Sequence, residues 1–231
     1  MQQIEDYYAD LTIKVNLIKE GYAKCLFVVG EAGIGKTTQI MEQLKGTQHV
    51  KIGGYLSPLK LYRLLFKYRN DYIVYMDDTE SIVDNPSCLI LLKQGLDTHE
   101  PRQITWETSS GRIKVPHTYD FTSRIIFCLN RLPEDEGFKA LIDRSEKIFL
   151  NFKYHDKIII MYQIATKQRK IKNYTLSPEE RKAIVDFIQA NIKDVSNISL
   201  RTQYKIENYY VYSFNNKKTD WKQLAIKLLS E

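Results

Sequence analysis

Residues 30–37 read Gly-Glu-Ala-Gly-Ile-Gly-Lys-Thr, which matches the pattern G-x-x-x-x-G-K-[ST] at every fixed position. An apolar run, Cys25–Val29, precedes this segment, and Thr37–Leu44 after it has a helical pattern. A strand, a glycine-rich turn and a helix in this order wrap backbone N–H groups around phosphate oxygens, and the helix N-terminus adds its positive dipole end. The segment therefore predicts a phosphate-binding loop in an α/β protein, rather than a glycine-rich turn before an ordinary helix.

The loop side chains have expected roles in binding a nucleoside triphosphate. Lys36 is expected to reach the β- and γ-phosphates, and the Thr37 hydroxyl to complete the ligand shell of a bound Mg²⁺. ATP and Mg²⁺ are therefore the expected cofactors. The residues expected to contact the nucleotide are Gly30, Glu31, Ala32, Gly33, Ile34, Gly35, Lys36, Thr37 and Thr38.

The composition limits the class of protein. Hydrophobic residues make up 43% and charged residues 27% of the 231 residues, which suits one α/β core with a smaller appended domain. The sequence has no run of about 18 apolar residues and no basic stretch followed by an apolar one near residue 1, so we expect no contact with a membrane and no signal peptide. Three cysteines are too few for a disulfide framework, which favours the cytoplasm, or the host cytoplasm if the source is viral.

The net charge of +6 is concentrated in the last third of the chain. Residues 1–150 contain 19 Lys and Arg against 20 Asp and Glu, whereas residues 151–231 contain 15 against 8. A basic module beside a neutral one suits a polyanionic partner such as DNA or RNA. A solvated, lysine-rich helical surface explains the same charge, and charge alone does not decide between the two.

Apolar runs separated by helical patterns predict the order of the elements. Apolar runs that do not alternate indicate strands buried on both faces, as in a parallel sheet. After residue 153 the pattern indicates helices only, so we predict an α/β core over residues 1–152 and an all-helical domain over residues 153–231. The expected strands are 25–29, 49–52, 72–76, 124–129 and 147–152; the expected helices are 37–44, 59–68, 88–96, 136–143 and 181–192, one after Ser199, and one after Thr219 or Asp220.

Polar side chains follow two of these predicted strands. One strand ends in Asp77 and Asp78; we assign Asp77 to Mg²⁺ through water and Asp78 to the general base that takes a proton from the attacking water. Glu80 is the reserve base. Asn130 follows another strand, where an amide can orient that water or sense the γ-phosphate, although Asn is also a common turn residue.

Two arginines are candidates for contacts with the γ-phosphate. Arg144 follows the predicted helix 136–143, where a guanidinium at a subunit edge can reach a neighbour's phosphate as an arginine finger. Arg201 lies in the first turn of the helix after Ser199, where it can touch the phosphate of its own subunit. An ordinary surface charge is the alternative for each.

In chain order, Gly30–Thr37, Asp77-Asp78, Asn130, Arg144 and Arg201 resemble the Walker A, Walker B, sensor 1, arginine finger and sensor 2 motifs of AAA+ ATPases. The resemblance implies a P-loop parallel sheet with a C-terminal helical lid, and hydrolysis of ATP to ADP and phosphate. It also implies a homo-oligomer, such as a hexameric ring, with active sites between subunits. Asp-Asp in place of the usual Asp-Glu is similar to superfamily 3 helicases of viruses and replicons, and it leaves the identity of the base open.

A β-hairpin is predicted over residues 103–117, with strands 103–107 and 112–115. Superfamily 3 helicases insert a hairpin at this place that grips DNA in a central pore, so the resemblance implies phosphate contacts here. The candidate residues for nucleic acid are Arg112, Lys114 and His117. Trp106 either stacks on a base or packs within the hairpin, and an ordinary excursion at the sheet edge is the alternative to the whole feature.

Three functions are consistent with these features. The first is an oligomeric ATPase acting on nucleic acid: a DNA helicase, a translocase or a helicase loader that serves replication of a virus or mobile element, with a replication protein that recruits it. The second is a protein remodeller or ATP-dependent switch whose basic lid binds an acidic protein. The third is a P-loop kinase of a small metabolite, against which the tandem acids, Asn130 and the helical C-terminal region count.

Overall fold

The computed structural model describes residues 3–107, 115–192, 198–216 and 219–230. The chain divides into two compact units. The core unit comprises Tyr8–Glu31 and Lys36–Leu150, and the C-terminal unit comprises Met1–Tyr7, Ala32–Gly35 and Asn151–Glu231. None of the described helices combines the length and the apolar character that crossing a bilayer requires.

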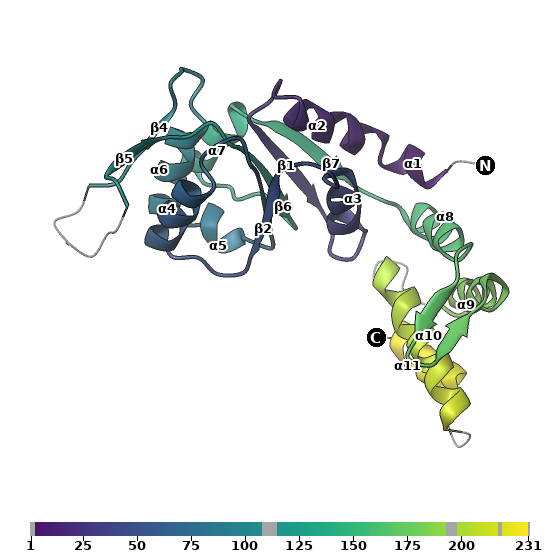
Figure 1. The fold of residues 1–231 in the computed structure, drawn as a ribbon. Coiled ribbons are helices and arrows are strands. Elements are labelled where there is room, and N and C mark those ends of the chain that lie inside the picture. The colour runs from purple at the N-terminus through teal and green to yellow at the C-terminus, as the bar shows by residue number, and fades with distance from the viewer. Residues whose placement is uncertain (1–2, 108–114, 193–197, 217–218, 231) are drawn as a thin grey trace. The chain divides into compact units, whose positions relative to one another are not determined.

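A parallel sheet of five strands forms the centre of the core unit, in the order β2-β3-β6-β1-β7 (Figure 1). Every residue of β1 is buried, because the neighbouring strands flank it and helices cover both faces, and this explains the unbroken apolar run in the sequence. The strands are β1 (Cys25–Gly30), β2 (His49–Gly53), β3 (Ile73–Asp77), β6 (Arg124–Leu129) and β7 (Glu146–Leu150). All five predicted strands are confirmed, with ends that differ by one or two residues.

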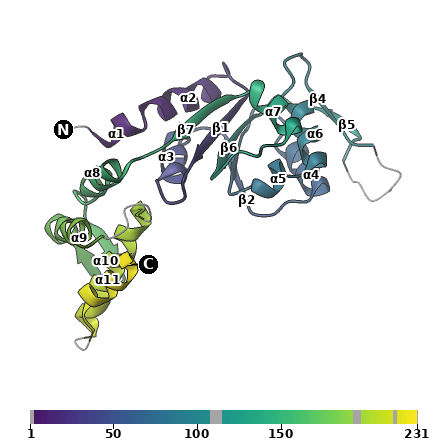
Figure 2. The same ribbon diagram turned by 180° about the vertical axis from the view of Figure 1, so that it is seen from behind.

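Helices cover the sheet on both sides (Figures 1 and 2). On one side lie α2 and α3, and on the other lie α4, α5, α6 and α7. The sequence analysis did not predict α2 or α5. The helices are α2 (Ala9–Lys19), α3 (Lys36–Gln43), α4 (Pro58–Lys67), α5 (Glu80–Val83), α6 (Pro86–Gly95) and α7 (Glu136–Asp143).

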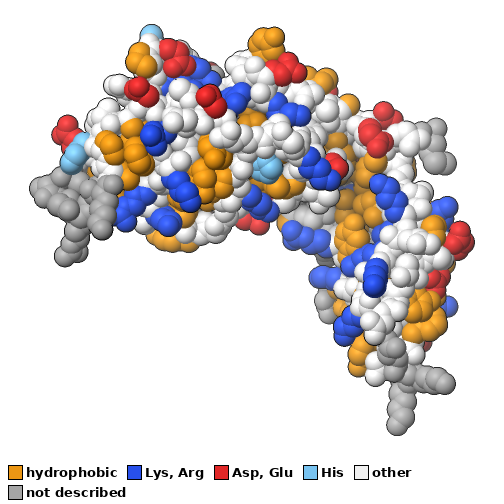
Figure 3. Space-filling model, viewed as in Figure 1, with side chains coloured by type: hydrophobic (Ala, Val, Ile, Leu, Met, Phe, Trp, Pro, Cys, Tyr) orange, Lys and Arg blue, Asp and Glu red, His pale blue; other side chains and the backbone are white. Residues whose placement is uncertain are grey.

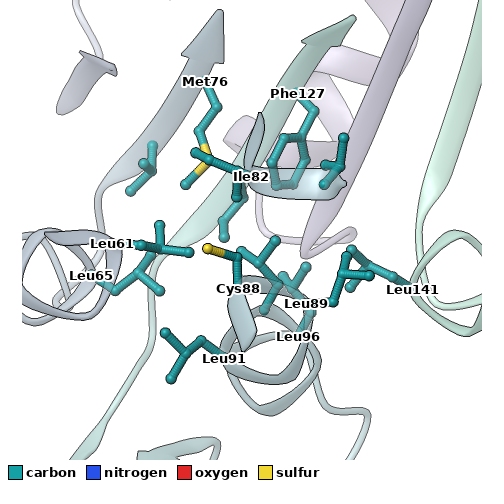
Figure 4. Close-up of a cluster of buried hydrophobic side chains, with 14 of the residues drawn as sticks. Leu61, Leu65, Met76, Ile82, Cys88, Leu89, Leu91, Leu96, Phe127 and Leu141 are labelled. Atoms are coloured by element: carbon teal, nitrogen blue, oxygen red, sulfur yellow. The ribbon is translucent and has the colours of Figure 1, made fainter. Parts of the chain in front are cut away.

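The main apolar core lies between the sheet and the second group of helices. Figure 4 shows its side chains from α4, α5, α6 and α7 facing Met76 of β3 and Phe127 of β6. The Phe27 ring stacks on Phe127 with centroids 4.7 Å apart and meets the edge of Phe138 at 5.3 Å. Burying such a side chain stabilises the fold by about 1.5–3 kcal/mol. The three cysteines are buried and unpaired, where they act as small hydrophobic groups.

The predicted hairpin is present with a different return strand. Strand β4 (Gln103–Thr105) pairs in antiparallel fashion with β5 (Thr118–Asp120), not with residues 112–115. The buried ring of Tyr119 explains this register, because it packs 5.1 Å from the Tyr62 ring and its hydroxyl donates to the Tyr62 carbonyl at 2.8 Å. Residues 108–114 lie outside the described residues.

The C-terminal unit is mainly helical but not all-helical, so the expectation of helices alone after residue 153 is wrong. Strands β8 (Arg169–Ile171) and β9 (Tyr174–Leu176) form an antiparallel hairpin whose turn contains Lys172 at a φ of 52°. Each strand has three residues, which is too short to show alternation, and Leu176 packs into the apolar core of this unit. The helices are α1 (Ile4–Tyr7), α8 (Tyr154–Ile164), α9 (Pro178–Asn191), α10 (Leu200–Asn215) and α11 (Trp221–Ser230).

Candidate nucleotide site

The glycine-rich loop connects β1 to α3, as its sequence predicts. Gly33 and Gly35 have φ angles of 78° and 86°, a left-handed conformation that glycine adopts without steric cost. Lys36 is only 6% exposed. Its ammonium group donates to the carbonyls of Gly30 at 2.6 Å and Glu31 at 2.8 Å, and to Oδ1 of Asn130 at 3.2 Å.

The Asp77 carboxylate lies at the carboxyl end of β3 and is surrounded by donors. The Thr37 hydroxyl lies 3.1 Å from Oδ1 and 3.2 Å from Oδ2. The Tyr75 hydroxyl donates to Oδ1 at 2.8 Å, and Nζ of Lys51 lies 2.7 Å from Oδ2. Burial by itself raises the pKa of Asp77, but the hydrogen bonds from Lys51 and Tyr75 outweigh it and lower the pKa.

This donor set suits Mg²⁺. A threonine hydroxyl and an ionised carboxylate are hard oxygen ligands, which this ion prefers to nitrogen or sulfur. The structure brings Thr37 and Asp77 together from α3 and β3. The two residues expected to serve the metal therefore lie within reach of one ion or of its bound water.

The other two acids differ in their surroundings. Glu80 begins α5, and its Oε1 accepts from both the backbone and the side-chain amide of Asn130, each at 3.2 Å. Asp78 is exposed, its φ is 52°, and its backbone N–H donates to the Cys128 carbonyl at 3.3 Å. Among the described residues, the Asp78 carboxylate has no hydrogen-bond partner. Asn130 thus links Glu80 to Lys36, while Asp78 is open to solvent.

Arg144 does not join this cluster in its own chain. It caps the C-terminal end of α7 and is exposed, two residues before β7 begins. The strands of the sheet are parallel, so Arg144 lies at the amino edge and the loop at the carboxyl edge. About five strand residues, or roughly 16 Å, separate the two edges.

Arg201 lies in the first turn of α10, in the unit that also contains Ala32–Gly35. In that unit the backbone N–H of Leu200 donates to the Gly33 carbonyl at 3.0 Å. The Arg201 side chain passes close to Gly33, where an added Cβ would lie 3.3 Å from its Cδ. Arg201 is therefore near the tip of the glycine-rich loop.

Only part of the hairpin site can be placed. His117 is exposed, and its carbonyl accepts from the backbone N–H of Trp106 at 2.8 Å. The Trp106 ring is partly buried 5.9 Å from the Tyr62 ring of α4, which corresponds to packing against the core rather than to an exposed stacking surface. Arg112 and Lys114 lie outside the described residues.

The sequence analysis missed Lys51 and Tyr75 as parts of the site. In the register of β2 and β3 these two residues are partners, and Lys51 Nζ lies 5.7 Å from the centre of the Tyr75 ring. A lysine between the apolar residues Val50 and Ile52 of a short strand was the available signal. That signal has meaning only once β2 is known to lie beside the strand that carries Asp77.

Comparison with known proteins identifies relatives in sequence and in structure. No protein-family model matches the chain. An uncharacterized 36.7 kDa protein of Enterobacteria phage T4, from the nrdC-mobD intergenic region, is 24% identical over 261 residues, which span 100% of this chain and 79% of the phage protein.

Solved structures of RuvB from Thermotoga maritima are similar to this chain. One RuvB mutant superimposes with a TM-score of 0.60 at 14% identity, covering 98% of this chain and 70% of RuvB. A second RuvB structure, described as a Holliday junction branch migration motor, gives 0.58 at 14% identity and covers 98% and 69%. The chain therefore has the α/β fold of RuvB, an AAA+ P-loop ATPase, with a parallel sheet of five strands and a mainly helical C-terminal region.

Proposed function

We propose that this protein is an oligomeric ATPase that acts on nucleic acid, as a DNA helicase, a translocase or a helicase loader. One observation carries the proposal: Lys36, Thr37, Asp77 and Asn130 meet at the carboxyl edge of the sheet. These are the residue types that bind a triphosphate and its metal. The RuvB fold supports DNA as the polymer. Service to replication of a virus or mobile element is part of the proposal, and the relative comes from a phage.

In this proposal each residue of the site has a separate role in binding or hydrolysing ATP. The loop 30–38 cradles the phosphates of ATP with its backbone N–H groups, and Lys36 turns from the Gly30 and Glu31 carbonyls to the β- and γ-phosphates. Thr37 and, through water, Asp77 would hold Mg²⁺, which would neutralise charge that develops on the phosphates. Asn130 orients the attacking water.

Asp78 is the proposed general base, and Glu80 is the reserve. The Asp78 carboxylate is exposed, whereas the Glu80 carboxylate already accepts two hydrogen bonds from Asn130. A base must reach the proton that it takes, so the two acids can be separated by substitution. Asp78→Asn should abolish hydrolysis and leave binding of a fluorescent ADP analogue unchanged, while Glu80→Gln should retain measurable hydrolysis. The reverse pattern would transfer the role to Glu80.

Arg144 is proposed to act on a neighbouring subunit, because its place at the amino edge of the sheet keeps it from the loop of its own chain. Arg201, beside the loop tip, is proposed to act in its own subunit. Mixing Arg144→Ala subunits with Asp78→Ala subunits should restore part of the hydrolysis at mixed interfaces. If confirmed mixed oligomers show no restoration, Arg144 does not act in trans.

The division of labour between domains is also part of the proposal. Residues 1–152 would form the ATPase core, and residues 153–231 the lid that moves with nucleotide state. The same proposal includes a homo-oligomer, such as a hexameric ring, and a replication protein that recruits it. It also includes the likeness to superfamily 3 helicases. Size measurement with a non-hydrolysable ATP analogue, with and without DNA, tests the oligomer.

ATP hydrolysis measured with and without nucleic acid tests the function as a whole. Hydrolysis should depend on Mg²⁺, rise when single- or double-stranded DNA is added, and disappear in Lys36→Ala. The folded state of that variant is checked by circular dichroism. No hydrolysis by the wild-type protein would refute the ATPase. Hydrolysis that nucleic acid leaves unchanged would instead favour the regulatory switch.

The hairpin is a separate element of the proposal. His117, together with Arg112 and Lys114, is proposed to contact nucleic acid phosphates, and Trp106 to hold the hairpin through Tyr62. Replacing Arg112 and Lys114 with glutamine should weaken DNA binding and leave hydrolysis without DNA unchanged. Unchanged DNA binding in this double variant would remove the hairpin from the proposal.

A further inference from the structure

Helix α10 carries a row of exposed side chains on one face. Arg201, Tyr204, Lys205, Asn208 and Tyr212 are all exposed, and their spacing of three, four, seven and eleven residues places them on one side of the helix,. We name these five residues the α10 stripe. Tyr204 is 36% and Tyr212 is 53% exposed, so both rings present apolar surface to solvent.

The α10 stripe contains cations and no acid. The one acid of α10 is Glu207, which is fully buried and not part of the exposed stripe. Its carboxylate is already bound by Nε of Arg181 at 2.7 Å and by Arg169. Within the described residues, Arg201 and Lys205 have no ion-pair partner. The charge of Lys205 is therefore available to an anion from outside the chain, while Arg201, beside Gly33, keeps the role proposed for it at the nucleotide.

One ring of the α10 stripe is held in place by a cation. The guanidinium carbon of Arg169, from β8, lies 4.5 Å from the centre of the Tyr204 ring, and Nη1 of Arg169 donates to the Tyr204 carbonyl at 3.2 Å. Arg169 is itself fixed by its ion pair with Glu207. A ring stacked on a fixed guanidinium loses little conformational entropy when a second flat group stacks on it.

The surroundings of the α10 stripe are basic. Lys167, Lys170 and Lys172, in and next to the β8–β9 hairpin, are all exposed. Lys and Arg side chains outnumber Asp and Glu side chains on the face of the C-terminal unit seen in Figure 3. Residues 151–231 contain 15 Lys and Arg against 8 Asp and Glu. This distribution attracts a polyanion.

We propose that the α10 stripe is a binding site for single-stranded nucleic acid. The faces of Tyr204 and Tyr212 stack on unpaired bases, while Lys205 contacts a backbone phosphate. Asn208 between them offers its amide N–H donors to base edges, because its Oδ1 already lies 3.5 Å from Nη2 of Arg169,. From Tyr204 to Tyr212 the stripe extends about 12 Å at 1.5 Å per residue, enough for a few nucleotides. A duplex does not suit the site, because paired bases do not expose their faces.

This inference rests on the proposed function, since nucleic acid is the polymer that the ATPase would act on. The test is the fluorescence anisotropy of a labelled 20-nucleotide single-stranded DNA titrated with the full chain, without ATP. Replacing both tyrosines, Tyr204→Ala with Tyr212→Ala, should weaken binding about tenfold or more. Replacing both with phenylalanine should retain binding, because phenylalanine stacks as well.

Two comparisons make the test specific. The double variant Tyr22→Ala with Tyr55→Ala removes two exposed tyrosines of the core unit, which are 79% and 81% exposed, and should bind as the wild type does. Lys205→Gln should reduce the slope of log binding constant against log salt by about 0.7, the value for one phosphate contact on a single strand. Thermal unfolding of each variant shows that it folds.

The outcomes separate this site from the proposed function. If the Tyr204 and Tyr212 double variant binds DNA as the wild type does, or if the Tyr22 and Tyr55 variant loses as much, the α10 stripe is not the site. Equal binding of a duplex, with equal loss in the stripe variant, would overturn the preference for single strands. Loss of binding in the stripe variant, with hydrolysis that DNA does not stimulate, would keep the site and refute the nucleic-acid motor.

Discussion

The geometry of the ion pair between Lys51 and Asp77 predicts how much the free energy of unfolding falls when Lys51 is replaced. Replacing Lys51 with methionine keeps an unbranched side chain and removes the charge 2.7 Å from the Asp77 carboxylate. At that distance the Coulomb energy is about 1.5 kcal/mol in water and several-fold larger in the interior of a protein. The Lys51 side chain is 43% exposed and that of Asp77 is 9% exposed, so solvent screens the attraction on one side only.

Two effects limit the net loss in free energy of unfolding when Lys51 is replaced with methionine. Holding a flexible lysine in one conformation costs entropy, which reduces the gain from an exposed pair to about 0.2–1 kcal/mol. Asp77 is more buried than that reference case, but it keeps the hydrogen bonds from Tyr75 and Thr37 after Lys51 is removed. We therefore expect Lys51→Met to lower the free energy of unfolding by about 1 kcal/mol, which corresponds to about 2–4 °C in Tm for a chain of this size.

Urea unfolding of a double-mutant cycle measures this energy. Lys51→Met should cost about 1 kcal/mol in the wild-type background and close to zero in an Asp77→Asn background, because the charge it pairs with is then gone. Lys147→Met is the matched control: it replaces an exposed lysine in β7, and among the described residues Lys147 has no ion-pair partner. An equal cost of Lys51→Met in both backgrounds would refute the assignment of its stability effect to Asp77.

Three further predictions concern stability away from the nucleotide site. Phe27→Ala, which empties the space between two other phenylalanine rings, should lower the free energy of unfolding in urea by about 3–5 kcal/mol; a loss below about 1 kcal/mol would contradict the packing. Glu207→Gln should cost about 3–5 kcal/mol because it leaves buried Arg181 without its counter-charge,, and an unchanged urea midpoint would show that the pair contributes little. Burial, with the hydrogen bond to Glu180, raises the pKa of Tyr210 to about 12. Because the folded pKa is above the unfolded value, the stability that the protonated Tyr210 contributes is complete below about pH 10 and is lost as the pH rises towards 12. Tyr210→Phe should therefore flatten the fall in urea midpoint between these two pH values. An unchanged slope would refute the reasoning.

Local signals predicted the parts of the site that lie in the loop and at strand ends. The glycine-rich loop, Asp77 and Asn130 each follow an unbroken apolar run, and the structure places them at the carboxyl edge of one sheet. The helix expected over 181–192 begins three residues earlier, at Pro178, where Ser177 and Glu180 form a capping box with hydrogen bonds of 3.2 and 2.8 Å. In each case the signal and its structural consequence lie within a few residues of one another.

Short elements and long-range pairings were not predictable in the same way. The three-residue strands β8 and β9 are below the length at which alternation shows, and β4 pairs with a strand that begins at Thr118 because Tyr119 packs on Tyr62. The link between Lys51 and Asp77 depends on β2 lying beside β3. A residue's own neighbours in sequence contain no information about such a pairing.

The amino-acid sequence by itself determined that a phosphate-binding loop exists, which strands are buried on both faces, and that tandem acids and an asparagine end two of those strands. The tertiary structure alone decided which of these side chains touch. Strand β6 lies between β1 and β3, and that order brings Asn130 to Lys36 and to Glu80 while Lys51 and Tyr75 surround Asp77. The reason is physical: loop and helix-end geometry is set by local backbone chemistry, whereas strand order is set by burying both faces of the sheet at once, which involves the whole chain.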